Sequence, residues 1–262
     1  MKKKLVNSNF KSVLLVSFLM LYASCKQDDT NEFSINDFKI TQEKVNNTLH
    51  GKFKFKNFTY SNTELDAGSS GENVNWDFSS LNDISTDFTS VVENCPENLN
   101  CNQFSNSDKI SFLEGENSYT YFSFSNNEFL ELGSYSTENG KNTYSDPKIT
   151  YKFPITYGQT YQDSFYASYE FSTEGNIAGN QTIAVDGYGT LKIPSGTFTP
   201  VLRIKRMQNI SNPMIPGLTT TIVSYEWIDK EGIIRLTLLN NNTTYLSNIN
   251  QNASIYYLID VE

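Results

Sequence analysis

Two neighbouring segments, TTTIVSYEWID (219–229) and GIIRLTLLNNN (232–242), decide the fold class, because apolar and polar residues alternate along both. Alternation with a period of two is typical of a strand with one buried face. The first segment places Thr221 on the same face as three apolar residues, and the second places three more on one face. We predict that these six apolar residues line a common interior, either a closed core or a ligand pocket: Val223, Tyr225, Trp227, Ile234, Leu236 and Leu238.

The same alternation recurs along the rest of the chain. In KFKFKNF (52–58), Phe53 and Phe55 share one face and the lysines the other. The segment SYTYFSFSNNEFLELGSY (118–135) consists of two extended runs around a Ser-Asn-Asn turn, which predicts a β-hairpin. Only LNDISTDFTSVVEN (81–94) has a composition that could hold a short helix. The chain is therefore predicted to be all-β with few short helices.

Prolines and glycines indicate where the strands turn and bend. TLKIPSGTFTPVLRIK (190–205) is two alternating runs separated by Pro194 and Gly196, of which proline presets φ and glycine tolerates positive φ. In the preceding strand, Gly187 and Gly189 permit a bulge or bend. A sheet that bends at these positions is expected to be strongly curved, with one concave apolar face.

The amino terminus, MKKKLVNSNFKSVLLVSFLMLYASC (1–25), has a basic start, an apolar run from 13 to 22 and two small residues before Cys25. This pattern is typical of a secretory signal, and its apolar run is shorter than the ~20 residues of a membrane-spanning helix. The Ala-Ser-Cys junction resembles the bacterial lipobox, which implies a lipoprotein signal peptide over 1–24. Cys25 is then acylated, palmitate included. The alternative is an ordinary signal peptide with an incidental cysteine.

The four residues after Cys25 predict the destination of the protein. Lys26, Gln27, Asp28 and Asp29 resemble the export signal of surface lipoproteins in Bacteroidota, which implies outer-membrane anchoring with display on the cell surface. The alternative is a solvated acidic tether. We take 25–34 as a lipidated flexible tether and 35–262 as one β-rich domain.

The other two cysteines, Cys95 and Cys101, flank a short Pro-Glu-Asn-Leu-Asn turn. Exported proteins commonly oxidise such pairs, so we predict a local disulfide, with two free thiols as the alternative. A zinc site would need further ligands, and the single histidine, His50, lies far away in the sequence. We expect His50 to have a surface or packing role, and we expect no metal or other cofactor.

Composition and charge exclude some partners. The chain is 38% hydrophobic and 14% aromatic, which is typical of a packed domain and not of a disordered chain. Its net charge is −9, and the first 24 residues hold four lysines and no acid, so removing them leaves −13. A chain this acidic is repelled by phosphate backbones, so we expect no nucleic-acid partner.

Four pieces of the chain carry a resemblance: GENVNWDFSSL (71–81), YKFPITYGQTYQDSF (151–165), VDGYGTLKIPSGTFTPVLRIKR (185–206) and YEWIDKEGIIRL (225–236). Together they resemble a group of uncharacterised secreted proteins of Bacteroidota, and the last three are more distantly similar to TapB-like β-rich envelope domains. The resemblance implies a strongly curved antiparallel sheet, a half-barrel or a β-sandwich, and no activity comes with it.

The sequence contains no nucleophile elbow, zinc-protease motif or phosphate-binding loop, and we name no catalytic residue. Acids distant in sequence could still meet as a general acid and base. The aspartates nearest the patterned segments are Asp77, Asp163, Asp186 and Asp229, for which the alternative is a role as solvated turn residues.

Aromatic residues suggest a binding function. Trp76, Trp227 and the tyrosines could form a stacking platform for sugars, although packing in a core is favoured. Two function classes therefore remain. The first is a non-catalytic surface lipoprotein that binds a glycan or an apolar ligand, or serves as a structural envelope component. The second is a carboxylate-dependent hydrolase acting on glycans. Protein partners and oligomeric state are not predicted.

Overall fold

The computed structural model describes residues 38–262 except 83, 96–97, 171–174 and 214. Most of the described chain is strand, which confirms the all-β prediction. In chain order the elements are β1 (Lys39–Ile40), α1 (Gln42–Thr48), β2 (Gly51–Ser61), β3 (Gly71–Asp77), β4 (Thr86–Asn94), the 3-10 helix η2 (Leu99–Gln103), β5 (Lys109–Leu113), β6 (Ser118–Ser125), β7 (Glu128–Ser136), β8 (Gly140–Lys152), β9 (Ile155–Thr156), β10 (Thr160–Glu170), β11 (Gly175–Ile193), β12 (Gly196–Ser211), β13 (Leu218–Asp229), β14 (Ile234–Tyr245) and β15 (Asn248–Val261).

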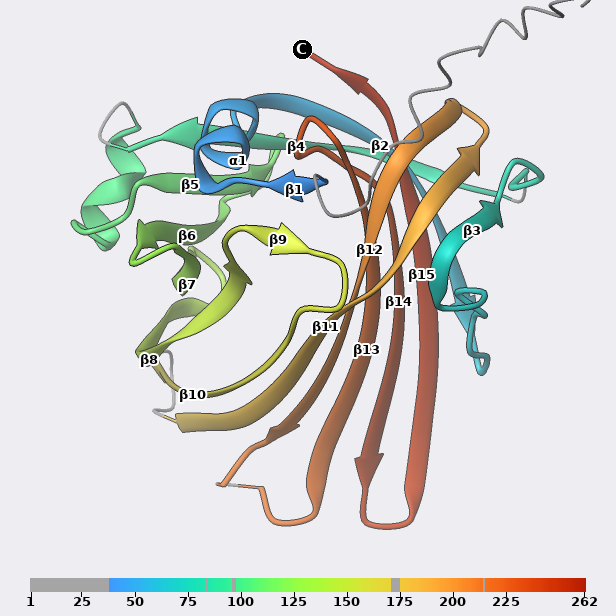
Figure 1. Cartoon of the computed structure of the whole chain (residues 1–262). Coiled ribbons are helices and arrows are strands. Elements are labelled where there is room, and N and C mark those ends of the chain that lie inside the picture. Colours follow the sequence, from blue (N-terminus) through green and yellow to red (C-terminus); the bar gives the residue numbers. More distant parts are fainter. Residues whose placement is uncertain (1–37, 83, 96–97, 171–174, 214) are drawn as a thin grey trace, which may run out of the picture. The chain divides into compact units, whose positions relative to one another are not determined.

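Twelve of the strands form a closed antiparallel barrel (Figure 1). Their order is β10-β8-β7-β6-β5-β4-β2-β15-β14-β13-β12-β11, and pairing of β10 with β11 joins the two ends. The expectation of a half-barrel or sandwich is therefore wrong in detail, although the strong curvature is correct. The 19-residue strand β11 makes the closure, because its residues 175–184 pair with β10 while its other edge pairs with β12. Further along the strand, β11 also pairs in parallel with β3.

Side chains complete the barrel wall where β8 separates from β10. Only the last part of β10, from Tyr166 on, pairs with β8. Beyond it, Asp163 Oδ2 accepts the backbone N–H of Ile149 at 3.0 Å, and Gln181 Nε2 donates to the Ile149 carbonyl at 2.7 Å. The Tyr161 hydroxyl accepts the backbone N–H of Lys152, further along β8, at 3.2 Å. These side-chain bonds take the place of the strand-to-strand hydrogen bonds that this part of β8 does not make with β10.

Glycines in β11 allow β3 to lie against the outside of the barrel. The register of β11 shifts on both sides of Gly187 and Gly189, which confirms the predicted bulges. A Cβ on Gly189 would collide with the backbone of Val74 in β3, and one on Gly187 would lie 2.9 Å from the Trp76 ring. Only glycine fits this close parallel approach.

The predicted turns are present. Asn126 and Asn127 connect β6 to β7, and both have the positive φ angles, 51° and 60°, of a tight hairpin. Pro194 and Ser195 connect β11 to β12. Phe53 and Phe55 of β2 are both buried on the inner face of the barrel, as their alternation predicts.

The helix expected within 81–94 is wrong: residues 86–94 form β4, which pairs with β2 and β5. The α-helix lies instead at α1, whose N-cap is Thr41; its side chain accepts the N–H of Lys44 at 3.3 Å. In Figure 1, α1 and β1 lie near the upper end of the strands, and the β12–β13 and β14–β15 hairpins extend to the lower end.

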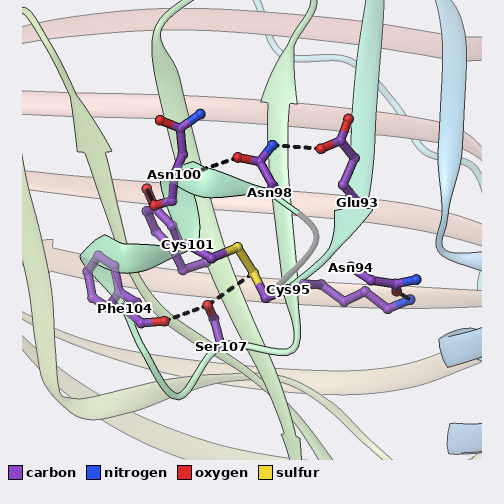
Figure 2. The surroundings of a disulfide bond; sticks show 10 residues. Glu93, Asn94, Cys95, Asn98, Asn100, Cys101, Phe104 and Ser107 are labelled. Carbon is purple, nitrogen blue, oxygen red and sulfur yellow. Dashed lines mark hydrogen bonds between the residues drawn. A yellow bond between two sulfur atoms is a disulfide. The ribbon is translucent and has the colours of Figure 1, made fainter.

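The predicted disulfide between Cys95 and Cys101 is present (Figure 2). Ser107 Oγ donates to Cys95 Sγ at 3.3 Å and to the Phe104 carbonyl at 2.6 Å. The Phe104 ring in turn stacks on the buried Tyr121 ring of β6, with 4.4 Å between centroids. The bridge therefore holds a short loop over the outer face of β5–β7.

The described residues belong to one compact unit. The predicted signal peptide, Cys25 and the residues from Lys26 to Asp29 lie outside the described part of the chain. None of the helices in that part has the length and hydrophobicity of a membrane span.

Candidate functional site

The barrel encloses a cavity of about 350 Å³. Nine of the twelve barrel strands contribute to its lining, and α1 contributes from one end. Most of the lining is aromatic or aliphatic, and the polar remainder is mainly hydroxyl groups. The lining residues are Val45, Thr48, Leu49, Phe53, Phe55, Phe88, Ser90, Val92, Ser111, Leu113, Phe122, Phe129, Thr150, Tyr151, Glu226, Ile228, Gly232, Ile233, Ile234, Thr237 and Tyr256.

Glu226 of β13 is the one charged residue among the described residues that line this cavity. The Tyr151 hydroxyl donates to its Oε2 at 2.9 Å, and Arg206 Nη2 lies 3.9 Å from the same oxygen. Arg206 is held from the other side, because its Nη2 also donates to the Thr150 carbonyl at 2.8 Å. The Glu226 and Arg206 side chains are only 15% and 12% exposed. A fixed ion pair thus stands at the edge of an apolar space.

The low dielectric of the interior shifts the acid–base equilibria of this cluster. Burial, and then the neighbouring Glu226 carboxylate, raise the pKa of Tyr151 well above its ordinary value. The same two causes raise the pKa of Tyr256, and burial raises that of Tyr161 to about 12. The pKa of Arg206 is raised by Glu226 and the tyrosines, against the effect of burial. Near neutral pH the tyrosines are therefore protonated donors and Arg206 is a cation.

Five of the six residues predicted to share an interior lie on the opposite, outer face of the sheet. Tyr225, Trp227, Leu236 and Leu238 belong to one apolar cluster, and Val223 lies on the same face of β13. The chain between β2 and β4, including β3, covers this cluster with Leu65, Ala67, Trp76, Phe78 and Leu81. Trp227, Leu236 and Leu238 are fully buried in this closed core outside the barrel. The half-buried Val223 and Tyr225 instead line a hollow on the outer face, beside Lys205 and Asn240.

Ile234 is the exception, and its predicted place on that face is wrong. Trp227 pairs with Leu236 whereas Ile228 pairs with Ile234, so β14 has one more residue than β13 at this point. The extra residue is Arg235, whose Nε donates to Asp229 Oδ2 at 2.7 Å. Because one inserted residue reverses the face of those before it, Ile234 joins Ile228 in the cavity lining.

The two tryptophans are core residues, not a sugar platform. Trp76 and Trp227 are 2% and 0% exposed, and their rings meet edge-to-face at 5.9 Å. Between them lies the buried Arg203, whose guanidinium is 5.1–5.9 Å from the ring centroids of Trp76, Trp227 and Tyr225. This cluster fixes the outer layer and buries both tryptophan rings, so neither offers a face to a ligand.

Each of the four candidate aspartates has its own structural partners, and none is among the residues lining the cavity. Asp77 caps a turn at Ser79, and Asp163 bonds the backbone of β8. Asp186 accepts two bonds from Arg203, at 2.8 and 3.0 Å. Asp229 accepts the N–H groups of its own turn in addition to Arg235. The structure does not bring them together as a catalytic pair.

Neither the comparisons with known proteins nor the arrangement of possible metal ligands identifies a further site. The chain matches no protein-family model, no curated protein and no solved structure. Within the described ranges there is no group of three or more His, Cys, Asp or Glu placed to hold a metal ion. His50 is exposed at the junction between α1 and β2.

Apart from Ile234, the residues of the cavity were not predicted as a site from sequence. Glu226 occupies the position between Tyr225 and Trp227, on the face of YEWID that alternation alone assigns to solvent. Arg206 lies on β12, which pairs with β13, and it reaches Glu226 across this strand pair, whereas Tyr151 of β8 meets Glu226 only because the barrel closes. A charged residue between two aromatic ones in a strand is a weak signal, since most such residues face water.

Proposed function

We propose that this chain is a non-catalytic binding module that takes a small apolar ligand inside the barrel. The observation that supports the proposal is the cavity of about 350 Å³, enclosed by strands and lined mainly by Phe, Val, Leu and Ile. Ligand sites in proteins are usually concave and apolar, with a few polar groups that fix orientation, and span roughly 300–1,000 Å³. Glu226, Tyr151 and Thr237 are such polar groups here.

The location of the module forms part of the same proposal. The Ala-Ser-Cys junction supports an acylated Cys25, and Lys26 to Asp29 support display on the outer face of a bacterial outer membrane. Acyl chains contribute about 0.8 kcal/mol per buried CH₂, so a multiply acylated cysteine is a stable anchor. The barrel would then present its cavity to molecules outside the cell.

Binding is tested with N-phenylnaphthylamine, a neutral apolar probe whose fluorescence rises when it leaves water. Titration of the wild type should saturate, and Ser111→Phe, which fills the cavity from β5, should weaken binding at least tenfold. The matched control is Ser118→Phe, because Ser118 is exposed at the start of β6. A wild type that does not bind the probe, or equal binding by Ser111→Phe, would contradict the proposal.

Anchoring is tested separately. The intact mass of the mature protein should begin at an acylated Cys25, and Cys25→Ala should leave the membrane fraction. Protease added to intact cells should degrade the wild type, whereas replacing Asp28 and Asp29 by alanine should protect it. Protection of the wild type would favour the acidic-tether interpretation.

A further inference from the structure

Glu226 sets the polarity of the cavity, because no other charged residue lines it in the described part of the chain. We propose that the ligand is an apolar molecule ending in a hydrogen-bond donor, an amine or a hydroxyl, which Glu226 accepts. This inference rests on the proposed binding function and names the chemical class of the ligand.

The two oxygens of Glu226 are used unequally. Both protein partners, the Tyr151 hydroxyl and the Arg206 guanidinium, approach Oε2. Oε1 accepts no hydrogen bond from any described residue, although each carboxylate oxygen has two lone pairs. Oε1 is not among the fully buried atoms that lack a partner, so it remains accessible at the cavity wall, where a donor on a bound ligand can bond to it. The geometry therefore favours a donor end group.

Arg206 holds the carboxylate from outside the lining. It is not among the cavity residues, and its Nη2 is already bonded to the Thr150 carbonyl. An anionic end group would have to pass the lining and approach this guanidinium, whose Nε is buried, beside the negative Glu226. Like charges in a low dielectric repel strongly, so a carboxylate on the ligand is disfavoured.

The remaining polar side chains of the lining do not impose the opposite polarity. Thr48 Oγ1 donates to the Lys44 carbonyl at 2.9 Å within α1. Ser90 and Ser111 bond to each other, with 3.3 Å between their hydroxyl oxygens. Neutral hydroxyls can accept or donate, so they accommodate either end group. The discrimination between ligands is left to Glu226.

The test displaces N-phenylnaphthylamine from the wild type with four ligands of one chain length: nonylamine, nonanol, methyl octyl ether and nonanoate. Nonanol and methyl octyl ether are isomers that differ in having or lacking a donor, so nonanol should bind at least fivefold tighter. Nonanoate should bind at least tenfold more weakly than nonanol. Nonylamine or nonanol as the tightest ligand would each support the proposal. Equal binding of the isomers, or nonanoate as the tightest ligand, would overturn it.

Glu226→Gln is the decisive variant, because it keeps the shape of the side chain and removes its charge. The ratio of nonanoate to nonanol affinity should rise at least tenfold, whereas Ser111→Ala, elsewhere in the lining, should leave the ratio unchanged. An unchanged ratio in a folded Glu226→Gln protein would overturn the inference. If that variant does not fold, the wild-type ranking alone decides. Failure of the probe to bind would contradict the binding function itself, whereas a reversed ranking with intact probe binding contradicts only the ligand class.

Discussion

The Tyr151 hydroxyl of β8 and the Glu226 carboxylate of β13 are 2.9 Å apart, although three other strands separate β8 from β13 around the barrel. The bond therefore crosses the interior instead of following the wall. Tyr151 is 5% exposed, so most of its hydrogen bonding must come from the protein, here from the carboxylate. This pair joins the packing of the barrel to the one charged group of the cavity.

Removing the Tyr151 hydroxyl should destabilise the protein. Tyr151→Phe leaves Glu226 short of a donor, and hydrogen bonds to charged groups contribute about 1.5–3 kcal/mol. Urea unfolding measures the difference in free energy. Tyr166→Phe, at a 41% exposed tyrosine of β10, is the control and should differ from wild type by less than about 0.5 kcal/mol. Equal stability of Tyr151→Phe and wild type would show that the bond does not form in solution.

The free energy of unfolding should decrease at alkaline pH. The pKa of Tyr161 is raised to about 12 and that of Tyr151 is raised well above its ordinary value, whereas an unfolded tyrosine ionises near pH ~10. The folded state therefore keeps protons that the unfolded state releases, so this contribution is fully present below pH ~10 and falls as pH rises above it.

The free energy of unfolding in urea should thus decline between about pH 10 and 12, by up to roughly 1.4 kcal/mol per pH unit for each such tyrosine. Tyr161→Phe should make the decline shallower, and Tyr245→Phe, at a 46% exposed position, should not. A pH profile identical in all three proteins would contradict the raised pKa values.

Arg203 should be indispensable to the outer layer. It is 2% exposed, binds both oxygens of Asp186, and donates to the carbonyls of Ala67 and Gly68. Arg203→Met leaves an uncompensated acid, and breaking a buried pair costs about 3–5 kcal/mol. Lys192→Met breaks only an exposed pair with Asp77 and should cost less than about 1 kcal/mol. Similar unfolding temperatures for the two variants would refute the role of Arg203.

Trp227→Ala should separate stability from binding. Trp227 is fully buried on the outer face, so its removal should cost about 3–5 kcal/mol. Because it does not line the cavity, the folded variant should bind N-phenylnaphthylamine with unchanged affinity. Chemical denaturation and probe titration measure the two quantities. Loss of affinity without loss of stability would place Trp227 in the site and contradict the arrangement of the two faces.

Local patterns predicted much of the fold. Alternation predicted the strands around Trp227 and Leu236. Paired asparagines predicted the β6–β7 turn, and the short spacing of Cys95 and Cys101 predicted the disulfide. Each of these depends on residues close together in the chain. The helix α1 was not predicted, because seven residues are too few to show a period of 3.6 residues.

Closure of the barrel could not be predicted, and the site depends on it. Alternation assigns only one face of β13 to the interior. In the structure both faces are buried, one under the connection between β2 and β4 and the other inside the closed barrel. Glu226 therefore lies inside, although its neighbours Tyr225 and Trp227 pack outside. The bulge at Arg235 moves Ile234 to the cavity, and no local signal gives the register that creates it.

The most direct test of the central claim, that the barrel cavity binds an apolar ligand, is a crystal structure with bromo-octanol, whose bromine is located by anomalous scattering. The account predicts bromine inside the barrel among the phenylalanines of the lining, with the ligand hydroxyl within hydrogen-bonding distance of Glu226. Bromine found only on the outer surface, with the cavity filled by side chains or ordered water, would contradict it.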